Sequence, residues 1–469
     1  MVCRSIVWGV MSASKLDTID FDFIMAECLR VGKRLSGDNI MEEHNLEYNG
    51  LHGGLGMMIT VPERVYRKSR RYNYPQLHLS YAANDRFFDI ARRKINSKRL
   101  GSHITVSEFV AFLKDEFYIY VIINNGTKDQ RGYSRLVDRT IKIAFKKMDS
   151  ERFYFPMLAL GLEQDIEIGS AKIVHRDVVF NMAKPLFDDS IINRADNFCD
   201  SGEFPYDHFL IVNVTKRSNE LRARVAKNIA EFIVGIFHVF SEHYNISHEF
   251  ISLSFNSLPR YNGFYFKSKN EKLNYNFSSK GNVLWSDTFW SKFQSDFKDD
   301  LKYTLSKLIG VALDPSRENT ISDRLIDSIY MFSGSLYDKD KTFCVVKLTT
   351  ALERLVSLTT DKNSGITTLN FKNRVASLVA LYYGDIDKWM TVAQEMYDVR
   401  SGIVHGNSSI YRGGNEINTC EYSQLAARAI ISACFGFYSL GLDTPDKDRI
   451  LSDFYKDLEY HCGVDTKEK

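Results

Sequence analysis

The stretch SDRLIDSIYMFSG at residues 322–334 decides the fold class of the second half of the chain. Its apolar side chains recur at three- and four-residue steps, the spacing of an amphipathic helix. They are Leu325, Ile326, Ile329 and Phe332. Ser322 is the expected N-cap of this helix, and residues 333–334 are its expected end.

The same helical spacing continues on both sides of this stretch. The further predicted helices are 290–309, 341–359, 371–383, 385–405 and 421–440. Asp314 and Pro315 separate the first of them from residues 322–334, and Gly406 follows the fourth at a position typical of a helix C′ residue. This part of the chain therefore predicts an all-α bundle.

Upstream of residue 290 the pattern is mixed. Runs rich in Ile, Val, Phe and Tyr predict strands at 57–61, 118–123, 153–160, 209–214 and 250–255. A long amphipathic helix is expected over residues 218–243. The predicted fold class is α+β. A mixed α/β or β-rich region over residues 1–300, with a further division near 150 as an alternative, precedes an all-α domain over residues 301–469.

The composition excludes several classes of protein. The 469 residues include 44% hydrophobic and 26% charged residues, and the 61 basic against 59 acidic side chains leave a net charge of +2. These values fit a globular chain, not a disordered one. No apolar run approaches the roughly 20 residues of a membrane span. Seven widely spaced cysteines without a Cys-x-x-Cys pair predict free thiols and a cytoplasmic protein.

The sharpest local motif is YDVRSGIVHG at residues 397–406. Arg400 and His405 are five residues apart, about 140° around an ideal helix, so they share a ligand only where the helix loosens or ends. A neutral histidine can take the proton of a ribose 2′-hydroxyl, and a guanidinium can hold the attacked phosphate. This pair therefore suits metal-independent RNA cleavage. Alternatively, a helix-terminal histidine interacts with the helix dipole and the arginine forms a surface ion pair.

Three ordered elements over residues 320–445 resemble the Apea-like branch of the HEPN superfamily. The run beginning at Arg324 precedes Ala351, Leu352 and Glu353, and the Arg-x4-His-Gly element follows at Arg400, His405 and Gly406. The resemblance implies a helical bundle, usually paired as a dimer. It also implies an endoribonuclease of an antiviral defence system of the abortive-infection type. The implied substrate is RNA, with tRNA as one candidate, and the implied trigger is derived from a phage. His405 would be the general base and Arg400 the phosphate clamp.

Two positions of this motif qualify the expectation. Ser401 stands where many such enzymes carry Asn, Asp or His, and it is a poorer orienting group. The alternative is therefore a catalytically inactive HEPN module that binds RNA or protein. Glu353 is expected to orient Arg400 across the bundle, since a buried arginine needs a carboxylate partner. Alternatively, Glu353 is a solvated carboxylate on a helix face.

The N-terminal region carries a second signal. Residues 61–150 hold 19 basic and 9 acidic residues, a net charge of +10 in a chain of net charge +2. The candidate RNA-binding residues, which interleave basic and aromatic side chains, are Arg64, Arg67, Lys68, Arg70, Arg71 and Tyr72. Further basic residues are Arg92, Arg93, Lys94, Lys98, Arg99, Arg131, Arg135, Arg139, Lys142, Lys146 and Lys147. Basic groups bind phosphates and aromatic rings stack on bases. The alternative is a solvated basic face.

The remaining candidates predict neither a metal site nor a cofactor. His238, His243 and His248 recur every five residues, which does not place them on one helical face, and no His-Glu-x-x-His element is present. His238 is expected to be a helix-face or core histidine. The resemblance implies RNA and a second copy of the chain as partners.

Overall fold

The computed structural model describes most of the chain, with gaps. The described residues are 13–34, 55–59, 61–63, 65, 77–98, 100–123, 128–201, 205–255, 262–269, 272–279, 288–315, 318–338, 340–361, 367–407 and 417–464. The chain divides into two compact units. The first consists of Met1–Glu151 with Val214–Arg224, and the second of Arg152–Asn213 with Val225–Lys469. The first boundary between the two units lies near residue 150, between Glu151 and Arg152. Whether residues 301–469 fold on their own stays a prediction.

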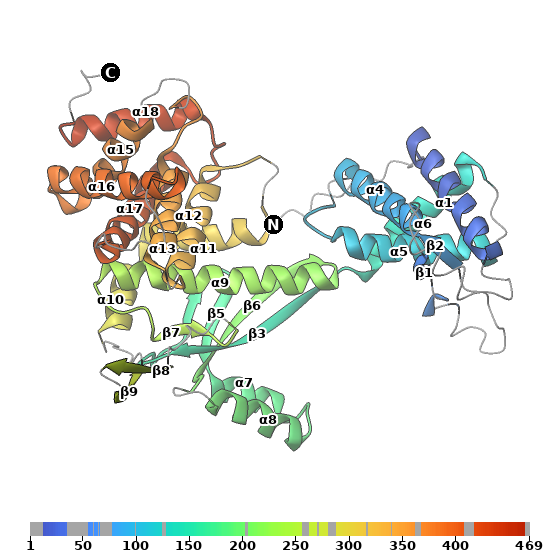
Figure 1. The fold of residues 1–469 in the computed structure, drawn as a ribbon, viewed down its shortest axis with the longest axis horizontal. Helices are drawn as coiled ribbons and strands as arrows, with labels where there is room; N and C mark the ends of the chain where they lie inside the picture. The colour runs from blue at the N-terminus through green and yellow to red at the C-terminus, as the bar shows by residue number, and fades with distance from the viewer. Residues whose placement is uncertain are drawn as a thin grey trace. The chain divides into compact units, whose positions relative to one another are not determined.

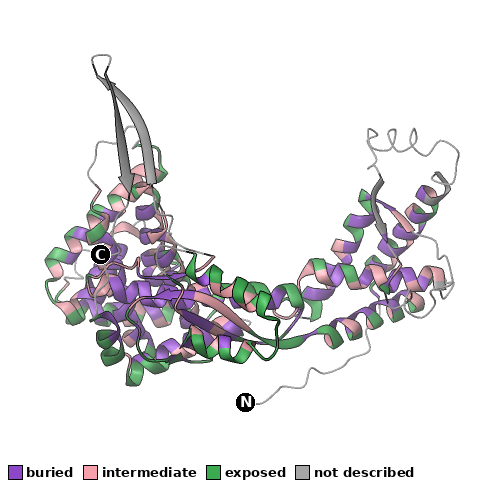
Figure 2. Cartoon of the chain, turned by 90° about the horizontal axis from the view of Figure 1, so that it is seen from below, coloured by how far each residue is buried: buried purple, intermediate pink, exposed green. Residues whose placement is uncertain are grey.

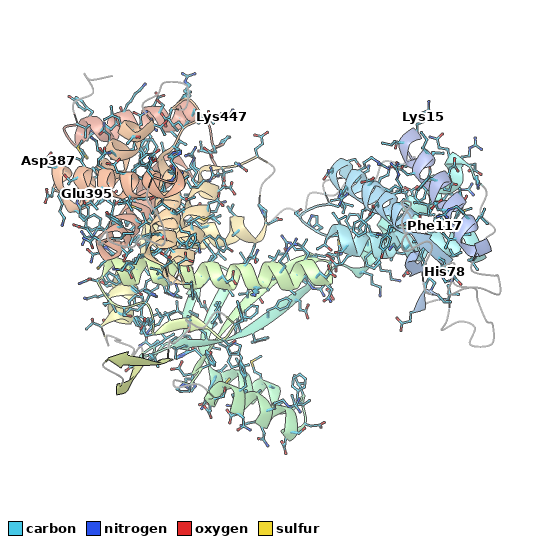
Figure 3. All side chains as sticks on the ribbon, viewed as in Figure 1. Lys15, His78, Phe117, Asp387, Glu395 and Lys447 are labelled. Atoms are coloured by element: carbon cyan, nitrogen blue, oxygen red, sulfur yellow. The ribbon has the colours of Figure 1, made fainter. Side chains whose placement is uncertain are left out.

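The first unit is mainly helical (Figure 1). Its elements are α1 (Lys15–Arg34), β1 (Leu55–Ile59), β2 (Leu77–Ser80), α4 (Tyr81–Lys98), α5 (Val106–Tyr118), the π-helical turn η1 (Ile119–Ile123) and α6 (Gln130–Lys147). Strands β1 and β2 form an antiparallel pair. In its core the rings of Phe21 and Phe87 pack against Phe117, which lies among the helices in Figure 3, and Tyr133 stacks on Phe21.

The predicted strand at residues 118–123 is wrong. Tyr118 ends α5, and residues 119–123 continue it as one π-helical turn. The run is rich in β-branched and aromatic residues, which favour strands. However, Tyr118 and Tyr120 are buried in the core of the first unit, and packing of that face overrides the local preference.

The segment Val214–Arg224 completes the first unit from a distant part of the sequence. The Glu108 carboxylate, in the capping box that begins α5, accepts a hydrogen bond from the Ser218 hydroxyl and one from the Glu220 backbone N–H at 2.8 Å. Arg222 donates to Glu151 at 3.0 Å. Burial alone would raise the pKa of Glu108. The hydrogen bonds from Ser218, Glu220 and Thr105 lower it by more than burial raises it, so the pKa lies below its ordinary value.

The second unit is built on a five-stranded sheet. Its strands are β3 (Asp149–Ala159), β4 (Ile166–Ile168), β5 (Ala171–His175), β6 (His208–Arg217) and β7 (Ile251–Leu253), in the order β4-β5-β6-β3-β7. Helices α7 (Arg176–Ala183) and α8 (Asp189–Asp200) connect β5 to β6, and β8 (Asn262–Lys269) pairs with β9 (Lys272–Ser279). The strands predicted at 57–61, 153–160, 209–214 and 250–255 all overlap observed strands.

The rest of the second unit is helical, and its helices pack around a buried centre (Figure 2). They are α9 (Asn219–His243), α10 (Phe289–Asp296), α11 (Asp299–Leu313), α12 (Ile321–Leu336), α13 (Lys341–Val356), α15 (Thr367–Tyr383), α16 (Ile386–Val404), α17 (Thr419–Leu440) and α18 (Asp448–His461). The α+β class with a helical C-terminal region is therefore confirmed.

Two details of the predicted helices differ. Residues 290–309 do not form one helix, because the chain breaks at Lys298 and Asp299, where Asp299 has a φ of 44°. Helix α12 begins after Thr320, which forms a capping box with Asp323, and it continues past Gly334 to Leu336. A glycine inside a helix is tolerated where packing supports the helix.

Helix α9 lies between the sheet and the C-terminal helices (Figure 1). His238, fully buried on α9, contacts both sides. Its Nδ1 lies 3.1 Å from the Ser333 hydroxyl of α12, and its Nε2 lies 3.0 Å from the backbone carbonyl of Ile251 in β7. Gly235 allows the close approach, because a Cβ there would lie 3.1 Å from the Ser333 Cβ. The prediction of a core histidine is confirmed.

The stability of the second unit should fall steeply in acid because of His238. Burial, with a smaller effect of the neighbouring His248, lowers the pKa of His238 to about 3 from 6.5. Below pH 6.5 the unfolded chain binds a proton that the folded chain does not. Each pH unit between about 6.5 and 3 therefore lowers the unfolding free energy by roughly 1 kcal/mol. His238→Gln, which stays neutral, should remove this slope in urea unfolding at several pH values. An unchanged slope would contradict the assignment.

Candidate active site

The site begins where α13 meets α16. Glu353 lies in the last turn of α13, and Arg400 lies one turn before the end of α16. The Arg400 Nη2 and the Glu353 Oε2 are 3.4 Å apart, and the two side chains are 22% and 23% exposed. The expected contact between these residues is therefore present. It is partly open to solvent, so the ion pair itself adds little to stability.

One aromatic ring of the same helix supports Arg400. The guanidinium carbon lies 5.8 Å from the centre of the Tyr397 ring, within reach of a cation–π interaction. The Tyr397 ring in turn packs on Phe371 of α15, with ring centres 4.9 Å apart. The Nε of Arg400 is buried without a hydrogen-bond partner in the described part of the chain. Arg400 is therefore held by one carboxylate and one ring.

His405 occupies the end of the same helix. Val404 is the last helical residue, and the His405 backbone N–H donates to the Ser401 carbonyl at 3.0 Å. Gly406 follows with a φ of 74°, a conformation that favours glycine. The predicted helix end is thus confirmed. The His405 side chain is exposed, and none of the described residues hydrogen-bonds its imidazole.

The structure therefore brings together Glu353 and Arg400 but does not join them to His405. Ser401 is half-buried and contributes its carbonyl to the helix end, and its role as an orienting group stays a prediction. An exposed imidazole one turn beyond a guanidinium can act on a ligand that approaches the end of α16 from solvent. The structure therefore presents a guanidinium and an imidazole at the C-terminal end of α16.

Two buried arginines fix the end of α13, and sequence reasoning did not identify their role. Arg324 Nη1 donates to the carbonyls of Leu355 and Ser357 at 3.1 and 2.8 Å. Arg374 donates to the Val356 carbonyl at 2.8 Å and to both oxygens of Asp361 at 2.6 and 3.0 Å. These carbonyls end α13 just after Glu353. An arginine inside an otherwise apolar helical stripe was the available signal.

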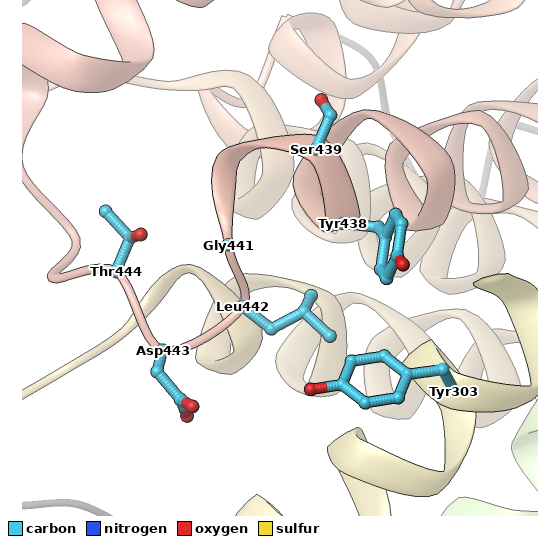
Figure 4. Close-up of a pocket in the computed structure, with 7 residues that line it drawn as sticks. All are labelled: Tyr303, Tyr438, Ser439, Gly441, Leu442, Asp443 and Thr444. Carbon is cyan, nitrogen blue, oxygen red and sulfur yellow. The ribbon is translucent and has the colours of Figure 1, made fainter.

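A cavity elsewhere in the second unit has no catalytic groups of this kind. It has a volume of about 800 Å³ and is lined by Tyr303, Tyr438, Ser439, Gly441, Leu442, Asp443 and Thr444 (Figure 4). The Asp443 carboxylate is already paired with Lys307 at 2.8 Å. Neither Arg400 nor His405 lines it, so it is not the site that the sequence motif indicates.

The candidate RNA-binding residues near the N-terminus give no structural test. Arg64, Arg67, Lys68, Arg70, Arg71 and Tyr72 all lie outside the described residues. Of the neighbouring basic residues, Arg93 and Lys94 pair with the buried Asp17. Burial alone would raise the pKa of Asp17. The hydrogen bonds from Lys94 and Ser14 outweigh this effect, so the pKa lies below its ordinary value. These two cations are therefore used inside the first unit.

Three further predictions concern thiols, metals and membranes. The six cysteines among the described residues are free, as expected. Within the same residues no group of three or more His, Cys, Asp or Glu side chains could hold a metal ion. None of the described helices combines the length and apolar character needed to span a membrane.

Comparisons with known proteins add no further support. No family model matches the chain, and no match was found among curated proteins or solved structures.

Proposed function

We propose that this protein is a metal-independent endoribonuclease of the HEPN type. The observation that supports the proposal is the contact between Glu353 and Arg400 on adjoining helices, with His405 exposed at the end of the helix that carries Arg400. The motif residues resemble the HEPN pattern in kind and order, and this contact pairs two of them. We further propose a cytoplasmic role in antiviral defence by cleavage of RNA.

In the proposed reaction, the substrate supplies its own nucleophile. The neutral His405 imidazole takes the proton of a ribose 2′-hydroxyl, and the 2′-oxygen attacks the adjacent phosphorus. The phosphorus–O5′ bond breaks, and the 5′-oxygen receives a proton. The products are a 2′,3′-cyclic phosphate and a 5′-hydroxyl. Arg400 would hold the phosphate oxygens, whose negative charge grows during the attack.

Pairing of two protomers is part of the proposal. Arg400 and His405 lie about 140° apart around an ideal helix, so one chain alone presents them in different directions. A second copy bringing its own α16 alongside would place an arginine and a histidine on each side of one bound RNA strand. The proposed active form is therefore a homodimer or a larger assembly.

The alternative is an inactive HEPN module that binds RNA or protein. Two observations favour it. Ser401 is a weak orienting group, and the Arg400 guanidinium is already occupied by Glu353 and Tyr397. In this alternative the arginine stabilises the bundle and the exposed His405 has no chemical role.

The chemistry of the product ends should separate the two functions. Purified protein incubated with total RNA should produce fragments with 2′,3′-cyclic phosphate ends, detected by their resistance to 3′-end labelling until the cyclic phosphate is opened and the phosphate is removed. EDTA should not inhibit, because the proposed groups are a histidine and an arginine. RNA that remains intact under all salt and pH conditions tested, with binding retained, would support the inactive module instead.

A further inference from the structure

Helix α6 of the first unit carries a row of cations on one side. Its exposed basic residues at this side are Arg131, Arg135, Arg139, Lys142 and Lys146. At 100° per residue these five positions fall within an arc of about 80°, and at 1.5 Å per residue they extend over about 22 Å. They therefore form one straight line of charge, which we call the α6 row. The helix stands among α1, α4 and α5 (Figure 1).

The α6 row has little counter-charge of its own. Among the described residues, none of its five members forms an ion pair, whereas Arg93 and Lys94 of α4 are neutralised by Asp17. Asp138, the one acidic residue of α6, lies at the edge of the row. Like charges four residues apart on a helix repel one another, and cations in its first turns oppose the helix dipole. An external polyanion would relieve both effects.

The opposite face of α6 is already used. Its residues Tyr133, Leu136, Val137, Ile141 and Ala144 are buried in the core of the first unit. The Tyr133 hydroxyl also donates to Asp22 at 2.7 Å. A helix that binds a membrane surface inserts its apolar face, and this one has no apolar face to offer. Only the charged row is open to a partner.

We propose that the α6 row binds the phosphodiester backbone of a nucleic acid, independently of base sequence. Residues four apart lie about 6 Å apart along a helix axis, so the row offers a regular series of cations to a regular series of phosphates. It contains no aromatic residue that could stack on bases, so it reads charge and not sequence. This binding uses the first unit alone and does not depend on the proposed cleavage.

The test is the salt dependence of nucleic acid affinity. The full chain carrying His405→Ala, which would leave RNA intact, is titrated into a labelled single-stranded RNA of mixed sequence. Five phosphate contacts predict a log–log slope of about −3.5, or a loss of affinity of about 100-fold between 50 and 200 mM salt. Removing three contacts with Arg131→Gln, Arg135→Gln and Lys142→Gln should reduce this loss to about sevenfold.

Matched variants show whether the salt dependence comes from the α6 row or from the positive charge of the first unit in general. Lys15→Gln, Lys216→Gln and Arg224→Gln remove three exposed cations of the same unit outside the row, and they should leave the slope unchanged. Arg131→Lys with Arg135→Lys keeps the charge and should keep the slope. Equal losses in the row and control variants, or an unchanged slope in the row variant, would overturn the proposal.

Two further ligands identify the source of the phosphates. Double-stranded DNA of equal length shows whether the row accepts DNA as well as RNA. Vesicles containing phosphatidylserine should not bind through the row, and binding to them without binding to nucleic acid would overturn the proposal. Cleavage is not measured in these experiments, so a failure of the proposed nuclease activity would leave their result unchanged.

Discussion

His405→Ala should reduce RNA cleavage by at least about 100-fold while the protein remains folded, since general base catalysis contributes roughly 10²–10⁴-fold. The side chain is exposed at the end of α16, and its removal breaks no hydrogen bond or ion pair among the described residues. The rate of cleavage of a labelled RNA and the midpoint of thermal unfolding give the two readouts. Toxicity on expression in cells should be lost together with cleavage.

His461→Ala is the matched control for this experiment. His461 is also exposed and also lies at the C-terminal end of a helix, α18, but it is not part of the motif. Its replacement should leave cleavage unchanged. Arg400→Lys keeps the charge but loses the planar fork of donors, so cleavage should fall there as well. Full activity in His405→Ala would remove the histidine from the mechanism.

The second large effect is on stability. Arg374→Ala should lower the unfolding free energy by about 3–5 kcal/mol, because it removes the cation that neutralises the buried Asp361 carboxylate. The two side chains are 6% and 7% exposed, and the guanidinium also lies 5.4 Å from the Tyr455 ring. Urea unfolding followed by circular dichroism measures the loss.

A surface pair in the same bundle provides the comparison. Arg354 pairs with Asp327 at 2.7 Å, with side chains 30% and 51% exposed. Arg354→Ala should therefore cost about 1 kcal/mol or less. If Arg374→Ala were no more costly than Arg354→Ala, the buried pair would not be the main support of the α13 end. Cleavage should also fall in Arg374→Ala, because Glu353 lies beside that end.

Long helices with a repeated apolar pattern could be predicted from the sequence. Short elements could be predicted less well. Helix α9 repeats its apolar residues over many turns, and Gly406 ends α16 by a local conformational rule, so both follow from sequence. Residues 119–123 are only one turn of strand-forming residues, and their state depends on what surrounds them. The break at Asp299 likewise depends on how α10 and α11 pack, which no local pattern encodes.

The candidate site was also predictable only in part. The contact of Glu353 with Arg400 was expected from the order of the motif elements. The support from Arg374 and Asp361 was not, because it joins residues 13 apart in the sequence through burial, which a sequence does not display. The α6 row was visible as a run of basic residues. Only the structure separates it from Arg93, which is used internally.

The segment Val214–Arg224 has a consequence for synthesis of the protein. Domains generally fold in order as they leave the ribosome, the N-terminal one first. Here the first unit is incomplete until residue 224 has emerged, because Ser218 and Glu220 supply hydrogen bonds to Glu108. By then most strands of the second unit have also emerged. The first 151 residues therefore cannot complete their native contacts until a segment more than 60 residues further along the chain has been translated.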